Sequence, residues 1–501
     1  MLDAVLAIDQ GTTGCTAVVL AADGSVLGRA TQEFTQHYPQ PGWVEHDPEE
    51  IWRVSLEVIG VALESASLED GRLRAIGITN QRETTVIWDR KTGEPLHRAI
   101  VWQSRQSSDI CEDVRANGLE SLITKKTGLV VDPYFSGSKA KWILDRYPDA
   151  RARAEAGELL FGTIDSWMLF KLTGGEVHAT EPTNASRTLL YDIRSQRWDR
   201  ELLSIFDVPE EMLPEVKPSS GIFGTTVPAG ALPGGVPVAG IAGDQQAALF
   251  GQGCWHPGMV KNTYGTGCFV MFNTGSELRR SDCGLLTTIC CDAHGRPAYA
   301  LEGSVFTTGA AVQWLRDEMG LISRADETEE VASRIADTQG VYVVPAFTGL
   351  GAPYWDMHAR GAIVGLTRGS GRDQIIRATL DSIAYQTRDV IDAMNRDSGE
   401  AVSELRADGG AAANNYLMQF QADILGVAVV RPQLLETTAA GSAFLAGLGT
   451  GLWRDPEELA GVWHEDRRFE PEMNVTTRER LYVGWQEAVE RARADRRESK
   501  I

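Results

Sequence analysis

The chain has 501 residues, of which 43% are hydrophobic and 23% charged, enough for two or three domains with sizeable cores. Its formal net charge of −21 disfavours binding to nucleic acid or to an anionic membrane surface. It contains no run of about 18 apolar residues, and its start, Met1-Leu2-Asp3, lacks the pattern of a secretory signal. Seven scattered cysteines form no CxxC pair. These features predict a cytoplasmic protein with reduced thiols and no membrane insertion.

The first predicted elements form a hairpin near the N-terminus. An apolar strand at residues 4–8 runs into Asp9-Gln10-Gly11-Thr12-Thr13-Gly14, and a second apolar strand follows at residues 16–21. Glycine permits a positive φ at a tight turn, and its missing side chain lets backbone N–H groups approach an anion. Because the hydroxyls of Thr12 and Thr13 add donors, the turn predicts a phosphate-binding loop. Turns of this composition are also common as purely structural features.

A helix and a strand are predicted next. Asp47-Pro48-Glu49-Glu50 is typical of a helix start, with Asp as the N-cap and Pro at the first helical position. Apolar side chains then recur at helical spacing and predict one buried face, made of Trp52, Leu56, Ile59 and Leu63. A strand at residues 75–79 delivers Asn80-Gln81-Arg82-Glu83 at its carboxyl end.

A second hairpin of the same kind begins at Lys261. The chain runs into Tyr264-Gly265-Thr266-Gly267 and returns through an apolar strand at residues 268–272. Further elements follow in an order similar to that of the first half: strands at 285–291 and 298–301, then a helix through Val312, Leu315 and Met319. Two phosphate loops therefore predict two similar α/β domains, residues 1–250 and 251–501, that hold one nucleotide between them. The charged segment 490–501 is expected to be a solvated helix end that frays.

Asp9 and Asp244 each end an apolar strand and are candidates for the chemistry of phosphoryl transfer. Asp9 lies beside the first loop and suits water-mediated Mg²⁺ binding, since Mg²⁺ keeps most of its waters. Asp244 suits the base that phosphoryl transfer needs beside the acceptor hydroxyl. Each residue alone has a structural alternative. Asp9 fits an Asx turn, and Asp244 fits the N-cap of a helix at residues 245–250.

A third glycine cluster predicts the nucleoside end of the site. The strand at 405–407 meets Asp408-Gly409-Gly410-Ala411, and a helix with Asn414 follows. Paired glycines at a strand-to-helix turn let a flat base lie against the backbone, with Asn414 placed to bond its edge. A tight packing turn is the alternative.

Other nucleotide-binding folds are disfavoured by missing motifs. The sequence contains no G-x-x-x-x-G-K-[ST] loop, no G-x-G-x-x-G fingerprint and no His-Arg-Asp catalytic run. The remaining interpretation is a clamp of two domains, in which the phosphates lie between the hairpins and an acidic residue binds magnesium.

Taken in order, these motifs resemble those of the glycerol kinases, within the carbohydrate kinase family that shares the fold of actin, hexokinase and the heat-shock ATPases. The resemblance runs from Val5 to about Glu490. Besides the segments above, it rests on Pro41-Gly42-Trp43-Val44-Glu45-His46, Asp132-Pro133-Tyr134-Phe135, Gly243-Asp244-Gln245-Gln246 and Gly349-Leu350-Gly351-Ala352-Pro353-Tyr354-Trp355-Asp356. It implies an α/β fold of two RNase H-like domains around a hinged cleft. It also implies ATP-dependent phosphorylation of glycerol to sn-glycerol 3-phosphate, with ATP and Mg²⁺ as cofactors and a homodimer or homotetramer as the assembly.

The resemblance also implies roles for single residues. Those expected to bind glycerol are Arg82, Glu83, Trp102, Tyr134, Asp244, Gln245 and Phe269. Those expected to bind ATP are Thr12, Thr13, Gly14, Thr266, Gly309, Gln313, Gly410 and Asn414. Asp244 is expected to be the general base, and Asp9 and Asp244 are expected to bind the metal. On two residues alone, Arg82 and Glu83 also fit a surface ion pair.

The sequence departs from its relatives in three places. Relatives commonly carry Ser and then Arg shortly after the threonine pair, whereas this chain has Gly14, Cys15 and Thr16. Residues 229–236, where some relatives bind fructose 1,6-bisphosphate, contain no Arg or Lys. The acidic residue with which some relatives bind a regulatory protein is missing around Thr476-Thr477-Arg478.

Two other functions stay open from the sequence. One is the same fold acting on another small polyol or ketose. The other is a catalytically silent nucleotide-binding switch, which the presence of both Asp9 and Asp244 disfavours.

Overall fold

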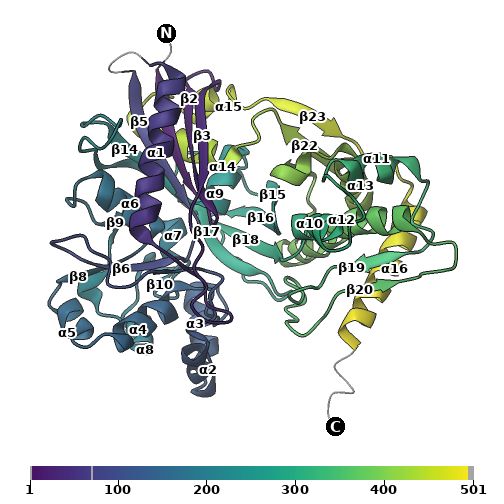
Figure 1. The fold of residues 1–501 in the computed structure, drawn as a ribbon, viewed down its shortest axis with the longest axis horizontal. Helices are drawn as coiled ribbons and strands as arrows, with labels where there is room; N and C mark the ends of the chain where they lie inside the picture. The colour runs from purple at the N-terminus through teal and green to yellow at the C-terminus, as the bar shows by residue number, and fades with distance from the viewer. Residues whose placement is uncertain (1–2, 69–71, 495–501) are drawn as a thin grey trace.

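The structure, a computed structural model, describes residues 3–68 and 72–494. Each half of the chain is built on its own large sheet, and the two sheets lie on opposite sides of the molecule, with α14 and α15 of the second half beside the first sheet (Figure 1). Within the described residues, no helix is both long and apolar enough to cross a bilayer.

The first sheet has six strands in the order β13-β14-β5-β1-β2-β3. Their bounds are β1 (Ala4–Gln10), β2 (Gly14–Ala21), β3 (Val26–Glu33), β5 (Leu73–Asn80), β13 (Ser220–Thr225) and β14 (Pro237–Gly243). β5 pairs parallel with both β1 and β14, with Asp9 opposite Thr79 and Gly243 opposite Asn80. The carboxyl ends of these three strands therefore meet at one edge of the sheet, where α/β folds commonly bind ligands.

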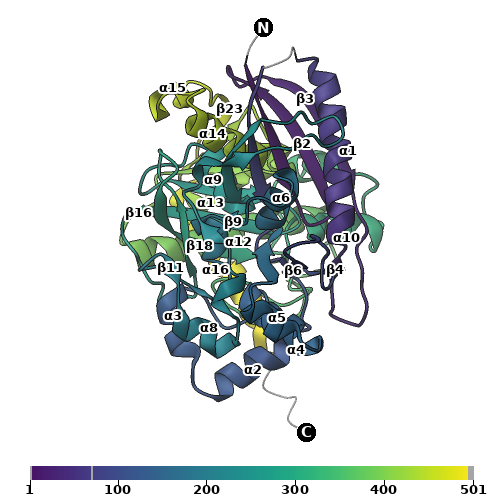
Figure 2. The same ribbon diagram turned by 90° about the vertical axis from the view of Figure 1, so that its left-hand side faces the viewer.

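Helices cover both faces of this sheet. α1 (Pro48–Ala66) and α6 (Ile164–Leu172) lie on one face, and α9 (Asp244–Gly251) and α14 (Thr437–Thr450) on the other. Figure 2 shows α1 running along β2 and β3. α14 comes from the second half of the chain and approaches very closely, because a Cβ on Gly77 would lie 2.3 Å from the carbonyl oxygen of Ser442.

The predicted start of α1 is confirmed, and its predicted buried face is right only in part: Ile59 is buried, and Trp52 and Leu63 pack against the same core. Asp47 caps the helix through the backbone N–H groups of Glu49 and Glu50. Trp52, Leu56 and Leu63 are only half-buried. The buried face consists of Pro48, Ile51, Val54, Ser55, Val58, Ile59 and Ala62. The helix carries two apolar stripes offset by about one residue, and the sheet packs on the one with the smaller side chains.

A four-stranded sheet with helices nearby combines β4, which precedes α1, with three strands that follow β5. Its order is β4-β7-β6-β8, with bounds β4 (Glu45–His46), β6 (Thr85–Asp89), β7 (Ala99–Ile100) and β8 (Leu159–Thr163). The helices nearby are α2 (Ser108–Ala116), α3 (Glu120–Thr127), α4 (Ser136–Arg146), α5 (Ala150–Glu155), α7 (Pro182–Ala185), α8 (Arg200–Phe206) and the 3₁₀ turn η1 (Glu210–Met212). Short strand pairs are β9 (Ala179–Thr180) with β12 (Glu215–Val216), and β10 (Tyr191–Asp192) with β11 (Arg197–Trp198).

The second large sheet has seven strands in the order β17-β18-β16-β15-β21-β22-β23. Their bounds are β15 (Val260–Tyr264), β16 (Cys268–Gly275), β17 (Leu286–Cys291), β18 (Pro297–Val305), β21 (Glu404–Asp408), β22 (Ala428–Pro432) and β23 (Glu465–Phe469). Like β1, β15 forms a hairpin with the next strand and pairs parallel with a later one, β21. The ends of β15 and β21 therefore lie side by side, as the ends of β1 and β5 do.

The remaining elements surround this sheet. They are α10 (Gly309–Asp317), α11 (Glu327–Arg334), β19 (Tyr342–Val344), β20 (Ala362–Val364), α12 (Arg372–Ser398), η2 (Gly410–Ala413), α13 (Asn415–Leu425), α15 (Pro456–Ala460) and α16 (Val475–Ala494). α10 ends before Met319, which is 42% exposed, so the predicted helix is shorter than expected. Of the predicted frayed end, residues 490–494 belong to α16, and 495–501 lie outside the described residues.

Candidate active site

Asp9 and Asp244 come together where β1 and β14 end. The pKa of Asp9 is raised to about 7, chiefly by burial and further by the charge of Asp244. Gly243, not Asp244, is the N-cap of α9, so the predicted capping role of Asp244 is wrong. The Asp244 carboxylate accepts the N–H of Gln245 at 2.7 Å and lies 3.1 Å from Nε of Arg82. At 29% exposure, this carboxylate is the open acidic group of the site.

Arg82 and Glu83 are buried, so the alternative of a surface ion pair is wrong: each side chain is 2% exposed. Arg82 donates from Nη1 and Nη2 to the Glu302 carboxylate at 2.8 and 2.9 Å. Glu83 has a φ of 61°, an uncommon value for a residue with a Cβ that the surrounding structure must hold in place.

Arg187 lies directly behind Glu83. Its Nε donates to Oε1 of Glu83 at 2.5 Å, and its other nitrogens donate to Glu302 at 3.1 and 3.3 Å. Burial raises the pKa of Glu83, while Arg187 and Arg82 work in the opposite direction. For Glu302, the two arginines outweigh burial and hold its pKa at about 2. No sequence motif predicted a role for Arg187 or Glu302, although a glutamate directly after the apolar run 298–301 was a usable signal.

Two buried lysines also lie around these groups, and no sequence pattern predicted a role for either. Lys139 donates to the backbone oxygens of Tyr134 at 2.5 Å and Glu83 at 3.2 Å, and burial lowers its pKa to about 7. Lys261 donates to Oε1 of Gln245 at 2.6 Å, and burial lowers its pKa to about 8. Both lysines thus fix the backbone or side chain of a residue predicted to bind the polyol.

Aromatic rings form one wall beside the ionic groups. The rings of Trp102 and Tyr134 meet edge to face with centroids 5.4 Å apart. The Nε1 of Trp102 donates to Oγ1 of Thr12 at 2.9 Å, which ties this wall to the first hairpin. Phe269 lies half-buried on β16, opposite Thr263 of β15.

The first hairpin has the predicted position but not the predicted backbone. None of the four glycines at the two hairpin tips has a positive φ: Gly11, Gly14, Gly265 and Gly267. Close packing explains Gly14 and Gly267 instead, because a Cβ would lie 2.6 Å from the backbone oxygen of Gln32 at the first and 2.5 Å from that of Val305 at the second. At the tip Thr13 is exposed and Thr12 is half-buried.

The second hairpin opens onto a cavity of about 460 Å³. Five of the residues predicted to bind the nucleotide line it together: Thr266, Gly309, Gln313, Gly410 and Asn414. Apolar side chains form much of the remaining lining, including Val312, Leu380 and Leu417. The other three predicted residues, Thr12, Thr13 and Gly14, lie on the first hairpin, outside this lining.

The two glycines of the third cluster have different roles. Gly409 has a φ of +85°, and a Cβ there would lie 2.6 Å from the backbone oxygen of Tyr264, so it is a packing turn. At Gly410 a Cβ would meet nothing within 4 Å, since this residue faces open space. Asn414 caps α13 by accepting the N–H of Leu417 at 2.9 Å and donates to Oγ1 of Thr328 at 3.2 Å.

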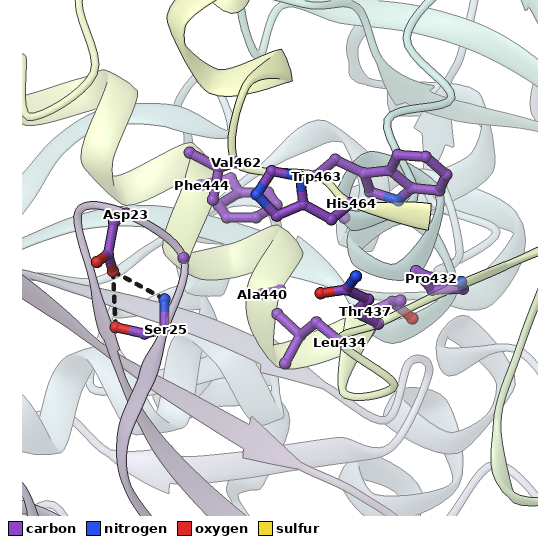
Figure 3. A pocket seen from close by; sticks show the side chains of 13 residues that line it. Asp23, Ser25, Pro432, Leu434, Thr437, Ala440, Phe444, Val462, Trp463 and His464 are labelled. Atoms are coloured by element: carbon purple, nitrogen blue, oxygen red, sulfur yellow. Dashed lines mark hydrogen bonds between the residues drawn. The ribbon is translucent and has the colours of Figure 1, made fainter. Parts of the chain in front are cut away.

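A smaller cavity of about 240 Å³ lies elsewhere, between the turn after β2 and the segments that flank α14 (Figure 3). Asp23 accepts the N–H and the hydroxyl of Ser25 at 3.0 and 2.6 Å on one side. Leu434, Phe444 and Val462 contribute apolar side chains on the other. Its lining includes none of the described residues predicted to bind substrate or nucleotide.

Comparison with known proteins places both halves of the chain in one family. Residues 4–251 match the description "FGGY family of carbohydrate kinases, N-terminal domain", and residues 260–450 match its C-terminal domain. A glycerol kinase of Carboxydothermus hydrogenoformans is 58% identical over 489 residues, covering 98% of each chain. A glycerol kinase of Shewanella sp. strain ANA-3 is 59% identical over 490 residues, covering 98% of this chain and 99% of that one.

Solved structures confirm the predicted fold of two α/β domains. The structure of Plasmodium falciparum glycerol kinase with ADP superposes with a TM-score of 0.92 at 35% identity and covers 98% of both chains. A gluconate kinase from Lactobacillus acidophilus gives a TM-score of 0.86 at 22% identity over 97% of both chains. The second likeness extends to the fold alone.

Proposed function

The chain belongs to the FGGY family of carbohydrate kinases, and on that premise we propose that it transfers the terminal phosphoryl group of ATP to glycerol. The products are ADP and sn-glycerol 3-phosphate. The observation that carries this proposal is the identity of 58% and 59% to glycerol kinases over 98% of the chain.

Glycerol binds, in this proposal, at the joined ends of β1, β5 and β14. Its hydroxyls need donors and acceptors and its short carbon edge needs an apolar wall, which the ionic groups and the aromatic rings supply. The residues we assign to it are Arg82, Glu83, Trp102, Tyr134, Asp244, Gln245 and Phe269.

Asp244 acts as the general base. Its carboxylate takes the proton of the terminal hydroxyl while the hydroxyl oxygen attacks the γ-phosphorus in line, and the bond from that phosphorus to the ADP oxygen breaks. The partial exposure of this carboxylate supports the assignment, as does its fixed orientation between Gln245 N–H and Arg82 Nε.

ATP lies between the two hairpins. We assign the nucleoside end to the cavity with Thr266, Gly309, Gln313, Gly410 and Asn414, whose apolar lining suits a flat base. Thr12, Thr13 and Gly14 hold the phosphates from the other side. The support is that β1 and β15 present their hairpin loops in equivalent positions of two similar sheets.

Asp9 and Asp244 suit a magnesium ion that keeps most of its waters. Carboxylate oxygens are ligands that Mg²⁺ prefers, and the charge of Asp244 raises the pKa of Asp9, a repulsion that a divalent cation relieves. No group of three or more His, Cys, Asp or Glu side chains with metal-binding geometry occurs in the described ranges. When bound with ATP, Mg²⁺ neutralises charge on the phosphates.

We further infer a division into domains of residues 1–250 and 251–501, a cytoplasmic location, and a homodimer or homotetramer. The free thiols of all seven cysteines support a reducing compartment. Light scattering after size-exclusion chromatography tests the assembly, with a monomeric mass as the contrary result.

A substrate panel with Mg·ATP tests the function. Glycerol, dihydroxyacetone, erythritol and xylulose are compared by ADP release, with glycerol expected to give the highest kcat/KM. A preference for xylulose or erythritol would assign the fold to another sugar. ATP binding without turnover on any of the four would instead indicate a nucleotide-binding switch.

A further inference from the structure

Four buried charges meet where the two large sheets adjoin: Arg82, Glu83, Arg187 and Glu302. Their side chains are between 0% and 2% exposed. Glu302 lies on β18 of the second sheet, whereas the other three precede residue 250. The ion pairs of Glu302 therefore join the second half of the chain to the first.

The Glu302 carboxylate is shared by two arginines. It accepts Nη1 and Nη2 of Arg82 at 2.8 and 2.9 Å, and Nη1 and Nη2 of Arg187 at 3.1 and 3.3 Å. A bidentate pair fixes the plane of a guanidinium as well as its position. The direction in which Arg82 presents Nε, 3.1 Å from Asp244, is thus set by a residue of the other sheet.

Arg187 orients Glu83, just as Glu302 orients Arg82. Its Nε donates to Glu83 at 2.5 Å, and its guanidinium stands 5.5 Å from the ring centroid of Tyr134. Glu83 has an uncommon backbone, with φ at 61°, and the bond from Arg187 fixes the direction of its carboxylate. Arg187 contacts both the carboxylate and the ring that we assign to glycerol.

Stability alone is a poor reason for such a cluster. The loss of hydration on burying an ion pair offsets much of its Coulomb attraction, and well-packed apolar side chains of similar volume are often as stable. What the cluster provides is geometry, because each arginine and each glutamate in it has one orientation.

We propose that Glu302 and Arg187 are positioning residues for glycerol: they orient Arg82 and Glu83 from behind, and Glu302 does so across the domain boundary. This inference rests on the proposed function. Neither residue is assigned to the reacting atoms, so both should act on glycerol binding more than on phosphoryl transfer.

Three variants test the proposal: Glu302→Gln, Arg187→Met and Arg187→Lys. For Glu302→Gln and Arg187→Met, we expect the KM for glycerol to rise about 10- to 100-fold, the range for losing a charge-assisted hydrogen bond. The kcat at saturating glycerol should stay within about threefold of wild type, as for lost ground-state binding. The Kd for Mg·ATP, measured by calorimetry, should not change. Arg187→Lys keeps the positive charge, so its KM for glycerol should rise less than that of Arg187→Met.

Glu181→Gln is the matched control, because Glu181 is an equally buried carboxylate that lacks an arginine partner among the described residues. It accepts Ser219 Oγ at 2.6 Å and the N–H groups of Thr183 and Asn184 at 2.8 and 2.7 Å. It should lose thermal stability and keep the wild-type KM for glycerol.

Two results would overturn the proposal. One is a wild-type KM for glycerol in the folded variants. The other is a change like that of Glu181→Gln, with lower thermal stability and no selective effect on glycerol. If neither Glu302→Gln nor Arg187→Met folds, Arg187→Lys decides alone, with an unchanged KM as the contrary result. A wild-type enzyme inactive on glycerol would instead refute the proposed function.

Discussion

Replacing Asp244 by asparagine should remove the base and leave the shape of the site. The amide keeps an oxygen for the N–H of Gln245, now at 2.7 Å from the carboxylate, and occupies the same space. It cannot accept the proton of the attacking hydroxyl. Loss of a general base costs about 10²- to 10⁴-fold in rate, or about 2.7–5.4 kcal/mol in activation free energy. We therefore expect kcat to fall at least about 100-fold.

The assay separates this effect from a binding defect. ADP release is followed at saturating glycerol and Mg·ATP, and the Kd of each ligand is measured by calorimetry. Asp132→Asn is the matched control, since its side chain is 28% exposed, accepts the N–H of Tyr134 at 2.9 Å and pairs with Arg105 at 2.9 Å. The control should retain kcat within about threefold, as for a surface ion pair. A near-normal kcat for Asp244→Asn would remove Asp244 from the base role.

Four further predictions concern binding, control and stability. Arg82→Ala should raise the KM for glycerol strongly and leave the Kd for Mg·ATP nearly unchanged; calorimetry that showed only ATP binding lost would place Arg82 on the phosphate side. Gly410→Val should weaken ATP binding with little change in melting temperature, because a side chain there enters the 460 Å³ cavity; an unchanged Kd would contradict the nucleotide assignment. Millimolar fructose 1,6-bisphosphate should not inhibit, since residues 229–236 carry no cation; clear inhibition would reveal another basic site. Burial raises the pKa of Asp389 to about 7, against 3.8 for the free side chain. Between these values the folded state keeps a proton that the unfolded state loses. The contribution of Asp389 to the free energy of unfolding is therefore lost as pH rises from about 4 to about 7. In urea titrations, Asp389→Asn should therefore lose less unfolding free energy between pH 5 and pH 8 than the wild-type protein does. A loss equal to that of wild type would show that other groups cause the pH dependence.

Local sequence patterns predicted the elements that depend on local interactions. The two hairpins, the capped start of α1 and the strand that carries Arg82 and Glu83 all lie where expected. Each of these depends on turn residues, caps or apolar runs within a few positions of one another.

Features that depend on distant contacts were missed or misread. Gly14 and Gly267 are required by the neighbouring strands rather than by a positive φ, and only the paired strand reveals this. Arg187 and Glu302 are 115 residues apart in the chain, so no spacing rule joins them. The buried face of α1 depends on which apolar stripe the sheet selects.

The most direct test of the account is the stoichiometry of the reaction with glycerol. ³¹P NMR of the protein with Mg·ATP and glycerol should show ADP and a glycerol phosphate monoester rising in equal amounts, with little inorganic phosphate. Omitting glycerol should nearly stop ADP release, because a site that excludes water does not hydrolyse ATP freely. ADP appearing with inorganic phosphate and no phosphate ester, with or without glycerol, would contradict the assignment of this chain as a kinase that acts on glycerol.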